Sequence, residues 1–400
     1  MGESGYASFA KRVFGVPLHQ LIVIGNGFDL ECGLKSGFYD FFRPRFEAID
    51  EIAYYDESRW CASVKDAGLT IWDFILHREK DSNWCDIERA IEQVVVKPEG
   101  TARYLSWPLT LAVGQIKSSP FAPTGITVTS NGRLAEENTP TKYMLGNISR
   151  YTWMSKGAMA SRFSEADLLA FLREQLTVLE TAFSNYLLTQ TASNDDYIKR
   201  SKELYDLLYQ DSLDSDDLGS TWTTVLDFNY TYPFGGAGFF MRDTDVVNIH
   251  GRVGGEIVFG IDGKDCMSDS GAMPYTKTYR VVSMGTRVPS QVFHDGSSNA
   301  DSATKYIKFY GHSLAEPDYS YFQSIFDGVN LYGGNTTLVF YYRPKLVGGV
   351  RTGEEAARTS MVNKVAKLLY TYGTTMDNVN HGQNLMHKLL LEGRLQVQRI

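Results

Sequence analysis

The clearest hydrophobic pattern in this chain is the apolar, β-branched run from Leu21 to Ile24, which ends abruptly in Gly25-Asn26-Gly27. Such a run predicts a buried parallel strand that is followed by a tight turn. Glycine has no Cβ, so the backbone N–H groups after the strand can approach an anion. However, Leu30 occupies the position of the third glycine in the dehydrogenase fingerprint. A phosphate loop and an ordinary strand-to-helix turn therefore both remain open.

Five further runs of short apolar sequence, each bounded by turn residues, predict the other strands of a parallel sheet. They are Thr223–Phe228, Asp245–Ile249, Ile257–Phe259, Tyr306–Tyr310 and Thr337–Tyr342. A long stretch with a helical pattern separates them from the first strand. The pattern therefore favours one α/β sheet whose first strand is split from the others by a large, mostly helical insertion.

Helices are predicted in three places. Ser164–Asp167 resembles a capping box and opens a helix with one apolar stripe. The stripe consists of Leu168, Leu172, Leu176, Leu179, Phe183 and Tyr186. A second helix is predicted over Tyr197–Gln210, and near the C-terminus a third is expected to begin after Thr352 and to stop at Gly373.

These elements predict a division of the chain into three parts. Residues 1–45 and 220–345 form the sheet core, residues 46–219 form the mostly helical insertion, and residues 346–400 form a C-terminal helical extension. Within the insertion, residues 98–160 contain Pro, Gly, Ser and Thr between short alternating runs, which indicates an irregular or small β segment.

Composition narrows the classes of function. The chain has 400 residues, 43% of them hydrophobic, and can bury a sizeable core. Its net charge of −8 argues against general nucleic-acid binding, which needs a basic surface. No run of about eighteen apolar residues predicts a membrane span. Met1–Pro17 has no apolar signal core, so secretion is not expected.

The cysteines and histidines give no sign of a metal. Cys32, Cys61, Cys85 and Cys266 lie far apart and form no C-x-x-C pair, which argues against structural zinc and against a disulfide framework. The seven histidines show no metal-ligand spacing. We therefore expect reduced thiols in a cytoplasmic protein, and no metal.

Chemistry-bearing side chains follow three of the predicted strands. Asn229 offers a donor and an acceptor for a ribose hydroxyl or a water, and His250 is suited to general-base catalysis near neutral pH. Gly311-His312-Ser313 follows another strand and precedes Asp318. Such residues also commonly satisfy turn backbone, so that alternative stays open. If the sheet is parallel, all of them meet Gly25 at its carboxyl edge, where we expect one ligand pocket.

In their order and combination these motifs resemble the bacterial abortive-infection AbiH family of phage-defence proteins along most of the chain. The matching segments are Ile24–Leu30, Gly33-Leu34, Tyr39–Phe41, Trp84–Glu88, Phe228–Thr231, Ile249–Gly251, Phe259–Asp262 and Gly311–Leu314 with Asp318. The resemblance implies a role in phage defence. It places no motif in residues 98–160 or in the last 50 residues.

The same series is similar, more distantly, to the sirtuin-like NAD-binding fold, which is a Rossmann-like parallel sheet. This similarity implies that Asn229 holds the ribose or a water and that His250 is the catalytic base. It also implies a phosphate loop at Gly25 and Gly27 and a second cofactor turn at Ser313. The implied cofactor-binding residues are Gly25, Asn26, Gly27, Phe28, Asp29, Tyr230, Thr231, Gly311, His312 and Ser313.

Two departures from the sirtuin pattern change the expected activity. The zinc cysteines of the deacylating sirtuins are absent, which argues against a protein deacylase, and zinc-free defence proteins with this fold typically hydrolyse NAD. Asp29 stands where sirtuins usually have a small hydroxyl residue. A carboxylate there would repel a diphosphate, so either the ligand is another nucleotide or Asp29 binds ribose hydroxyls and faces away from the phosphates.

The resemblance thus implies a cytoplasmic defence effector, a NAD glycohydrolase that releases nicotinamide. The alternative is a non-catalytic sensor of a nucleotide or of ADP-ribose within a defence complex. A nuclease on the same scaffold is disfavoured by the acidic net charge. We expect a homo-oligomer or a partner defence protein, no membrane, and no direct contact with nucleic acid.

Trp84–Glu88 lies in the predicted insertion and allows two interpretations. Asp86 and Glu88 are two residues apart and do not share a helix face, so a paired acid/base role is disfavoured. Favourable charges at the positive start of a helix are the preferred interpretation. If the insertion folds over the site, Glu88 reaches the ligand instead.

Overall fold

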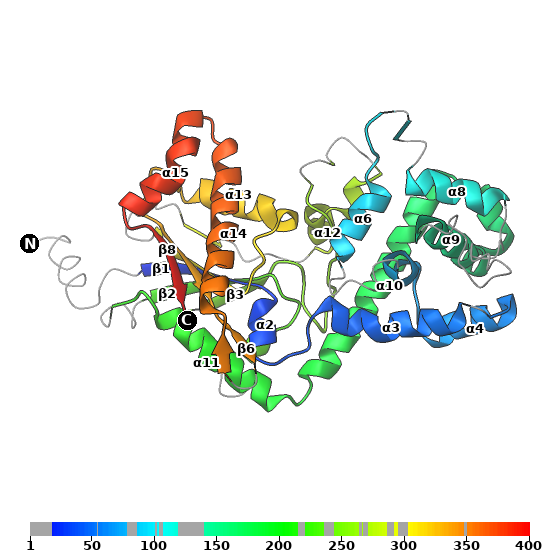
Figure 1. Cartoon of the computed structure of the whole chain (residues 1–400), viewed down its shortest axis with the longest axis horizontal. Coiled ribbons are helices and arrows are strands. Elements are labelled where there is room, and N and C mark those ends of the chain that lie inside the picture. The colour runs from blue at the N-terminus through cyan, green and yellow to red at the C-terminus, as the bar shows by residue number, and fades with distance from the viewer. Residues whose placement is uncertain are drawn as a thin grey trace, which may run out of the picture. The chain divides into compact units, whose positions relative to one another are not determined.

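The computed structural model describes residues 18–53, 55–77, 86–100, 102–103, 107–118, 140–214, 221–235, 244–263, 266, 271–285, 292–294, 303–347 and 350–400 (Figure 1). The chain forms two compact units. The first comprises Met1–Lys35, Gln190–Arg252 and Thr286–Ile400, and the second comprises Ser36–Thr189 and Val253–Gly285.

The first unit is built on a six-stranded parallel sheet in the order β3-β2-β1-β4-β5-β8. The strands are β1 (Leu18–Ile24), β2 (Thr221–Asp227), β3 (Thr244–Asn248), β4 (Thr304–Tyr310), β5 (Thr337–Tyr342) and β8 (Leu395–Arg399). From β1 the chain adds β2 and β3 on one side, and then β4, β5 and β8 on the other side, so the topological switch point lies between β1 and β4. In open α/β sheets ligands bind beyond the carboxyl ends of the strands at such a switch point.

Helices cover both faces of this sheet (Figure 1). One face is covered by α2 (Gly27–Glu31) and α11 (Asp195–Gln210). The other is covered by α13 (Tyr319–Gly328), α14 (Glu354–Thr374) and α15 (Val379–Leu391). The unit also contains the 3₁₀ turns η3 (Pro233–Gly235) and η6 (Glu316–Asp318), and an antiparallel pair of β6 (Lys345–Val347) and β7 (Val350–Thr352).

Strand β1 confirms the predicted buried parallel strand. Leu21 and Val23 point into the core on the α13–α15 face, whereas Ile22 and Ile24 point into the core on the α11 face. All four are at most 1% exposed. Burial of each such side chain contributes roughly 1.5–3 kcal/mol to folding, which explains why both alternating sets are apolar.

The second unit is mostly helical. Its helices are α3 (Phe38–Ile52), α4 (Glu57–Asp66), α5 (Ile71–Leu76), α6 (Ile87–Val95), α8 (Pro108–Ser118), α9 (Pro140–Lys156), η2 (Gly157–Arg162), α10 (Glu165–Thr191), η4 (Met273–Tyr275) and α12 (Lys277–Ser283). The predicted helices at Ser164 and at Tyr197 are confirmed as α10 and α11. An aromatic cluster joins α3 to α10, in which the ring centroid of Phe183 lies 5.1 Å from that of Phe38 and 5.1 Å from that of Phe41.

Several sequence-based assignments were wrong. Within residues 98–160, the helices α8 and α9 lie where an irregular or small β segment was predicted, whereas residues 119–139 lie outside the described residues. Ile257–Phe259 is not a strand, because its backbone is held by side chains of α10 and α12. The C-terminal helix begins after Gly353, which has φ +72°, and Gly373 lies inside it. Gly373 is required there by close helix packing, since a Cβ would lie 2.5 Å from the Gly382 carbonyl oxygen.

Two elements lie differently from the predicted division of the chain. α11 belongs to the range predicted as insertion, yet it packs on the sheet of the first unit. β8 belongs to the range predicted as a C-terminal helical extension, yet it pairs with β5 in that sheet. Among the described helices, none has the length and apolar content that a membrane crossing requires.

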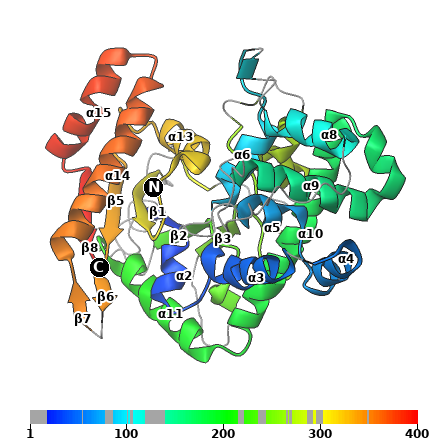
Figure 2. The same ribbon diagram turned by 45° about the vertical axis from the view of Figure 1, so that its right-hand side comes forward.

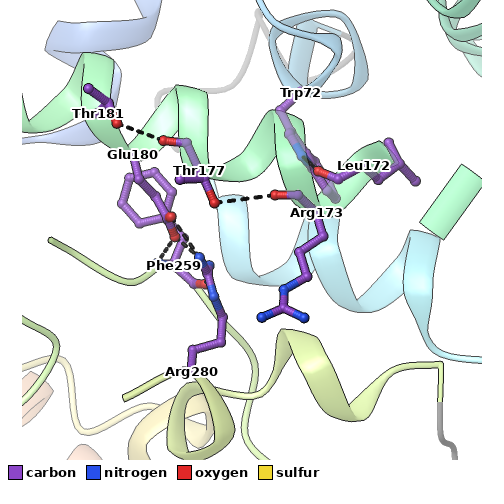
Figure 3. Close-up of polar contacts among 8 residues, drawn as sticks. All are labelled: Trp72, Leu172, Arg173, Thr177, Glu180, Thr181, Phe259 and Arg280. Atoms are coloured by element: carbon purple, nitrogen blue, oxygen red, sulfur yellow. Dashed lines mark hydrogen bonds and ion pairs between the residues drawn. The ribbon is translucent and has the colours of Figure 1, made fainter. Parts of the chain in front are cut away.

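A buried ion pair organises the second unit around Phe259 (Figure 3). Glu180 of α10 and Arg280 of α12 form a bidentate pair, with Arg280 Nη2 2.7 Å from Glu180 Oε2. The Phe259 N–H donates to Glu180 at 2.6 Å, and its carbonyl oxygen accepts from Arg280 at 2.7 Å. Burial raises the pKa of Glu180, and the Arg280 guanidinium opposes that rise. Both charges are therefore paired, and the non-regular segment between them is fixed.

Candidate functional site

Four loops of the first unit meet at the carboxyl edge of its sheet. Gly25 follows β1, Asn229 lies two residues after β2, His250 lies two residues after β3, and Gly311 follows β4. These strands are neighbours in the order β3-β2-β1-β4. Figure 2 shows the same elements from a second direction. The prediction that these segments share one edge is confirmed.

The glycines after β1 and β4 are in direct backbone contact. The Gly27 N–H donates to the Gly311 carbonyl oxygen at 2.8 Å, and the Gly25 N–H donates to the Tyr310 carbonyl oxygen at 3.1 Å. A Cβ on Gly27 would lie 2.6 Å from the Gly311 Cα. Gly311 itself has φ +70°, and a Cβ there would lie 2.4 Å from the Phe28 nitrogen. The absence of side chains thus lets two loops touch.

This contact bears on the predicted phosphate loop. The N–H groups of Gly25, Gly27 and Phe28 all donate to carbonyl oxygens within the chain. The space that a Cβ on Gly27 would occupy is filled by Gly311. The geometry therefore favours the ordinary strand-to-helix turn, which the sequence left open as an alternative. The main role of this turn is to pack the end of β1 against the end of β4.

Asp29 faces the interior of the unit. Its two carboxylate oxygens accept hydrogen bonds from the Tyr197 hydroxyl and the Thr231 hydroxyl, each at 2.7 Å. The residue is 1% exposed. Burial raises its pKa to about 6, although the two hydrogen bonds oppose the rise. Asp29 therefore ties α2 to α11 and to the loop after β2, and it faces away from solvent.

A second buried carboxyl, Asp227, ends β2. It accepts from the Asn229 N–H at 2.8 Å and from Asn248 Nδ2 at 3.1 Å. Burial, and then the charge of Asp29, raise the pKa of Asp227 well above its usual range. Asn248 also donates to the carbonyl oxygens of Asn229 and Thr231. This network fixes the backbone of residues 229–231.

Asn229 is 4% exposed, and its side-chain amide donates to the Gly25 carbonyl oxygen at 3.2 Å. The residue therefore connects the end of β2 to the turn after β1. Sequence reasoning did not select Asp227, Asn248 or Tyr197. A signal existed for the first two, because both are polar residues that end apolar runs, and they pair across β2 and β3.

The other predicted cofactor residues separate into buried and exposed groups. Phe28 is a core residue with its ring centroid 6.3 Å from that of Tyr310, and Thr231 is buried beside Asp29. Asn26 and Ser313 are exposed, and Tyr230 is half-buried. The Ser313 hydroxyl accepts from the Ala315 N–H at 3.3 Å.

Two imidazoles and a carboxylate form a compact cluster at the same edge. His312 Nε2 lies 3.3 Å from one oxygen of Asp318, and His250 Nε2 lies 3.6 Å from the other. The Phe228 ring lies against both imidazoles, with centroid distances of 4.5 Å to His312 and 5.5 Å to His250. Both histidines are buried, and the Asp318 side chain is 14% exposed. Sequence analysis gave Asp318 no role in this site.

Trp84 and Cys85 lie outside the described residues, but the rest of that motif is defined. The Asp86 side chain caps α6 by accepting from the Arg89 N–H at 2.9 Å. Glu88 lies in the first turn of α6, and its carboxylate lies 2.6 Å from Lys277 Nζ. The helix-start interpretation is supported by this geometry. Within the described part of the chain, no three His, Cys, Asp or Glu side chains are grouped to hold a metal ion.

Comparison with known proteins gives one match. No curated protein and no solved structure matches the chain. The model of the family described as "Bacteriophage abortive infection AbiH" matches residues 21–342, which include most of β1, all of β2 to β5 and the whole His250–Asp318–His312 cluster. Because the match covers well over half of the chain, this protein belongs to the AbiH family of bacteriophage abortive infection proteins.

Proposed function

We propose that this AbiH protein defends the cell by binding NAD at the carboxyl edge of its sheet and hydrolysing the N-glycosidic bond. The C1′–N bond breaks and its electron pair stays on the nicotinamide nitrogen. Water forms the new bond to C1′ and releases a proton. The products are nicotinamide and ADP-ribose. The enzyme has to position the water and stabilise an oxocarbenium-like ribosyl group.

The observation that supports this proposal is a histidine paired with a carboxylate beside the switch point of a parallel sheet. His250 lies 3.6 Å from Asp318, and Asn248 at the end of its strand donates partly buried hydrogen bonds to the carbonyl oxygens of Asn229 and Thr231. A carboxylate near an imidazole favours the imidazolium that forms when the base takes a proton. In this proposal His250 is the base, and Asn229 orients the ribose or the water.

The backbone contact between Gly27 and Gly311 shapes the proposed binding mode. Since those N–H groups bond within the chain, the diphosphate is held by other groups at the edge. The exposed residues Asn26 and Ser313 are the predicted cofactor residues best placed for this. The Asp29 carboxylate is buried and accepts hydrogen bonds from Tyr197 and Thr231, so it faces away from a diphosphate at the exposed edge.

The test is the release of nicotinamide by purified protein, with NAD affinity measured in parallel by calorimetry. We expect turnover by the wild type, and His250→Ala or His250→Gln to lower it by roughly 10²–10⁴-fold while NAD still binds. His387→Ala, at an exposed position on α15, is the matched control and should retain full turnover.

The two competing functions give different results. NAD binding without nicotinamide release by any form of the protein would support the sensor alternative. Neither binding nor release, with and without extract of infected cells as a source of trigger, would overturn both the enzyme and the NAD sensor.

A further inference from the structure

Asp318 lies between His250 and His312, and the two imidazoles differ in their capacity to accept a proton. We propose that Asp318 is a positioning residue that stabilises the protonated form of His250, and that His312 serves to hold Asp318 rather than to bind a cofactor. The catalytic part of this inference rests on the proposed function, whereas the arrangement of protons does not.

The protonation of His312 is set by the backbone. Its Nδ1 accepts the Leu314 N–H at 2.9 Å, so Nδ1 bears no proton. The ring proton is therefore on Nε2, which lies 3.3 Å from Asp318 Oδ2 and donates toward it. A second proton on this ring would direct an N–H at the Leu314 N–H. His312 is thus a neutral donor to Asp318, and it is unsuited to act as the base.

The conformation of Leu314, in the loop between His312 and Asp318, holds the His312 ring in this orientation. Leu314 has φ +56°, a left-handed conformation that costs a non-glycine residue energy and persists only where the surroundings impose it. Its side chain is buried in the core on the α13 face, and its N–H is the one that fixes His312. Asp318 follows in η6 and immediately precedes α13.

His250 faces the other oxygen of the same carboxylate. His250 Nε2 lies 3.6 Å from Asp318 Oδ1, within ion-pair range but longer than a hydrogen bond. The aromatic rings of Phe228 and Tyr321 lie against His250, with centroids at 5.5 Å and 5.6 Å. Aromatic surroundings exclude water and lower the local dielectric, so the carboxylate acts more strongly on the imidazolium than it would in solvent.

The test compares Asp318→Asn, which keeps the shape but removes the charge, with Asp318→Glu, which keeps the charge. The matched control is Glu316→Gln, because the Glu316 side chain is 81% exposed and pairs only at the surface with Lys367. For NAD hydrolysis we expect Asp318→Asn to lower kcat by roughly 10²-fold or more, with KM nearly unchanged. The acidic limb of its pH–rate profile should move to lower pH, and Asp318→Glu should recover part of the rate.

A second readout does not depend on NAD. Ring ¹⁵N shifts of histidine-labelled protein report which nitrogen bears the proton, and we expect the Nε2–H form for His312 in the wild type. At one fixed pH near 6.5, the fraction of His250 present as imidazolium should be lower in Asp318→Asn than in the wild type and Glu316→Gln.

The outcomes separate the two proposals. An Nδ1–H form of wild-type His312 would overturn the role of His312 as a donor to Asp318. An unchanged fraction of His250 imidazolium in folded Asp318→Asn would overturn the role of Asp318. If Asp318→Asn does not fold, the wild-type tautomer and the Asp318→Glu variant still decide the matter. If His312 has the expected tautomer and the His250 imidazolium fraction is lower in Asp318→Asn, but the wild type releases no nicotinamide, only the proposed hydrolysis is overturned.

Discussion

Asp29 illustrates how a residue that was chosen for ligand binding can serve the fold instead. Its carboxyl group accepts from Tyr197 and Thr231 in the interior, and burial raises its pKa to about 6, against 3.8 for the ordinary group. The folded state thus binds the proton more tightly than the unfolded chain. Stability from this group is fully present below pH 4 and is lost as the pH rises through 6.

The pH dependence of stability tests this residue. Between pH 4 and 6 the free energy of unfolding of the wild type should fall by an amount on the order of 3 kcal/mol from Asp29 alone. The amide side chain of the Asp29→Asn variant does not titrate. Its free energy of unfolding, measured by urea denaturation at several pH values, should therefore change less steeply with pH over this range. Asp377→Asn, at an exposed position, should keep the wild-type slope. Equal slopes in wild type and Asp29→Asn would contradict the raised pKa.

A second prediction at the residue scale concerns Gly27. A Cβ would meet the backbone of Gly311 at 2.6 Å, and backbone cannot move aside as a flexible side chain can. We expect Gly27→Ala to lower the free energy of unfolding by about 1–3 kcal/mol. Gly114→Ala is the control, because that helical glycine has open space around it and the change should stabilise α8 by up to about 1 kcal/mol. An unchanged free energy of unfolding in Gly27→Ala would argue that the two loops are not in contact.

At the scale of elements, a buried ion pair replaces strand pairing in holding the segment around Phe259. Glu180 and Arg280 come from α10 and α12, and between them they bind both the N–H and the carbonyl oxygen of Phe259. This explains why an apolar run that has the pattern of a strand is not one. The pair ties three parts of the second unit together.

Breaking this pair should be costly. We expect Arg280→Ala to destabilise the protein by about 3–5 kcal/mol, because it leaves the Glu180 charge buried without its partner. The double variant Glu180→Gln/Arg280→Met should recover much of that loss. Arg399→Ala, which removes an exposed pair with Glu354, should cost less than about 1 kcal/mol. Chemical denaturation measures the free energy of unfolding of all three variants. Equal losses for Arg280→Ala and Arg399→Ala would contradict a stabilising role of the buried ion pair.

At the scale of the whole molecule, the protein combines a sheet unit and a helical unit, and the AbiH match spans segments of both. The His250–Asp318–His312 cluster lies entirely within the sheet unit. If the proposed hydrolysis is the basis of defence, substitutions in this cluster should abolish protection.

Infection of cells that express the protein tests that dependence. With a phage that triggers defence, we expect cellular NAD to fall and nicotinamide to rise in cells with the wild type and with His387→Ala. Cells with His250→Ala should keep their NAD and lose protection, since the proposed base is absent. Immunoblots of the three proteins control for abundance. Protection by His250→Ala at wild-type level would separate defence from NAD hydrolysis.

The sequence by itself determined the central strand, the two long helices α10 and α11, and the gathering of four motifs at one sheet edge. These follow from local patterns, since hydrophobic periodicity defines an element and parallel pairing brings strand ends together. β8 was missed because no residue of this edge strand is fully buried, and Leu395 and Val397 alternate with glutamines in a weak pattern. The AbiH resemblance was likewise present in the motifs, and the family match confirms it.

Only the tertiary structure decided which motif residues face inward and which pair with each other. Asp29 meets Tyr197, which is 168 positions away. Asp318 lies close to both His250 and His312, although these residues follow β3 and β4, which are separated by β2 and β1 in the sheet. The glycines after β1 and β4 proved to be neighbours rather than two independent ligand loops. Burial and hydrogen-bond direction depend on contacts between distant segments, and those contacts leave no periodic trace in the chain.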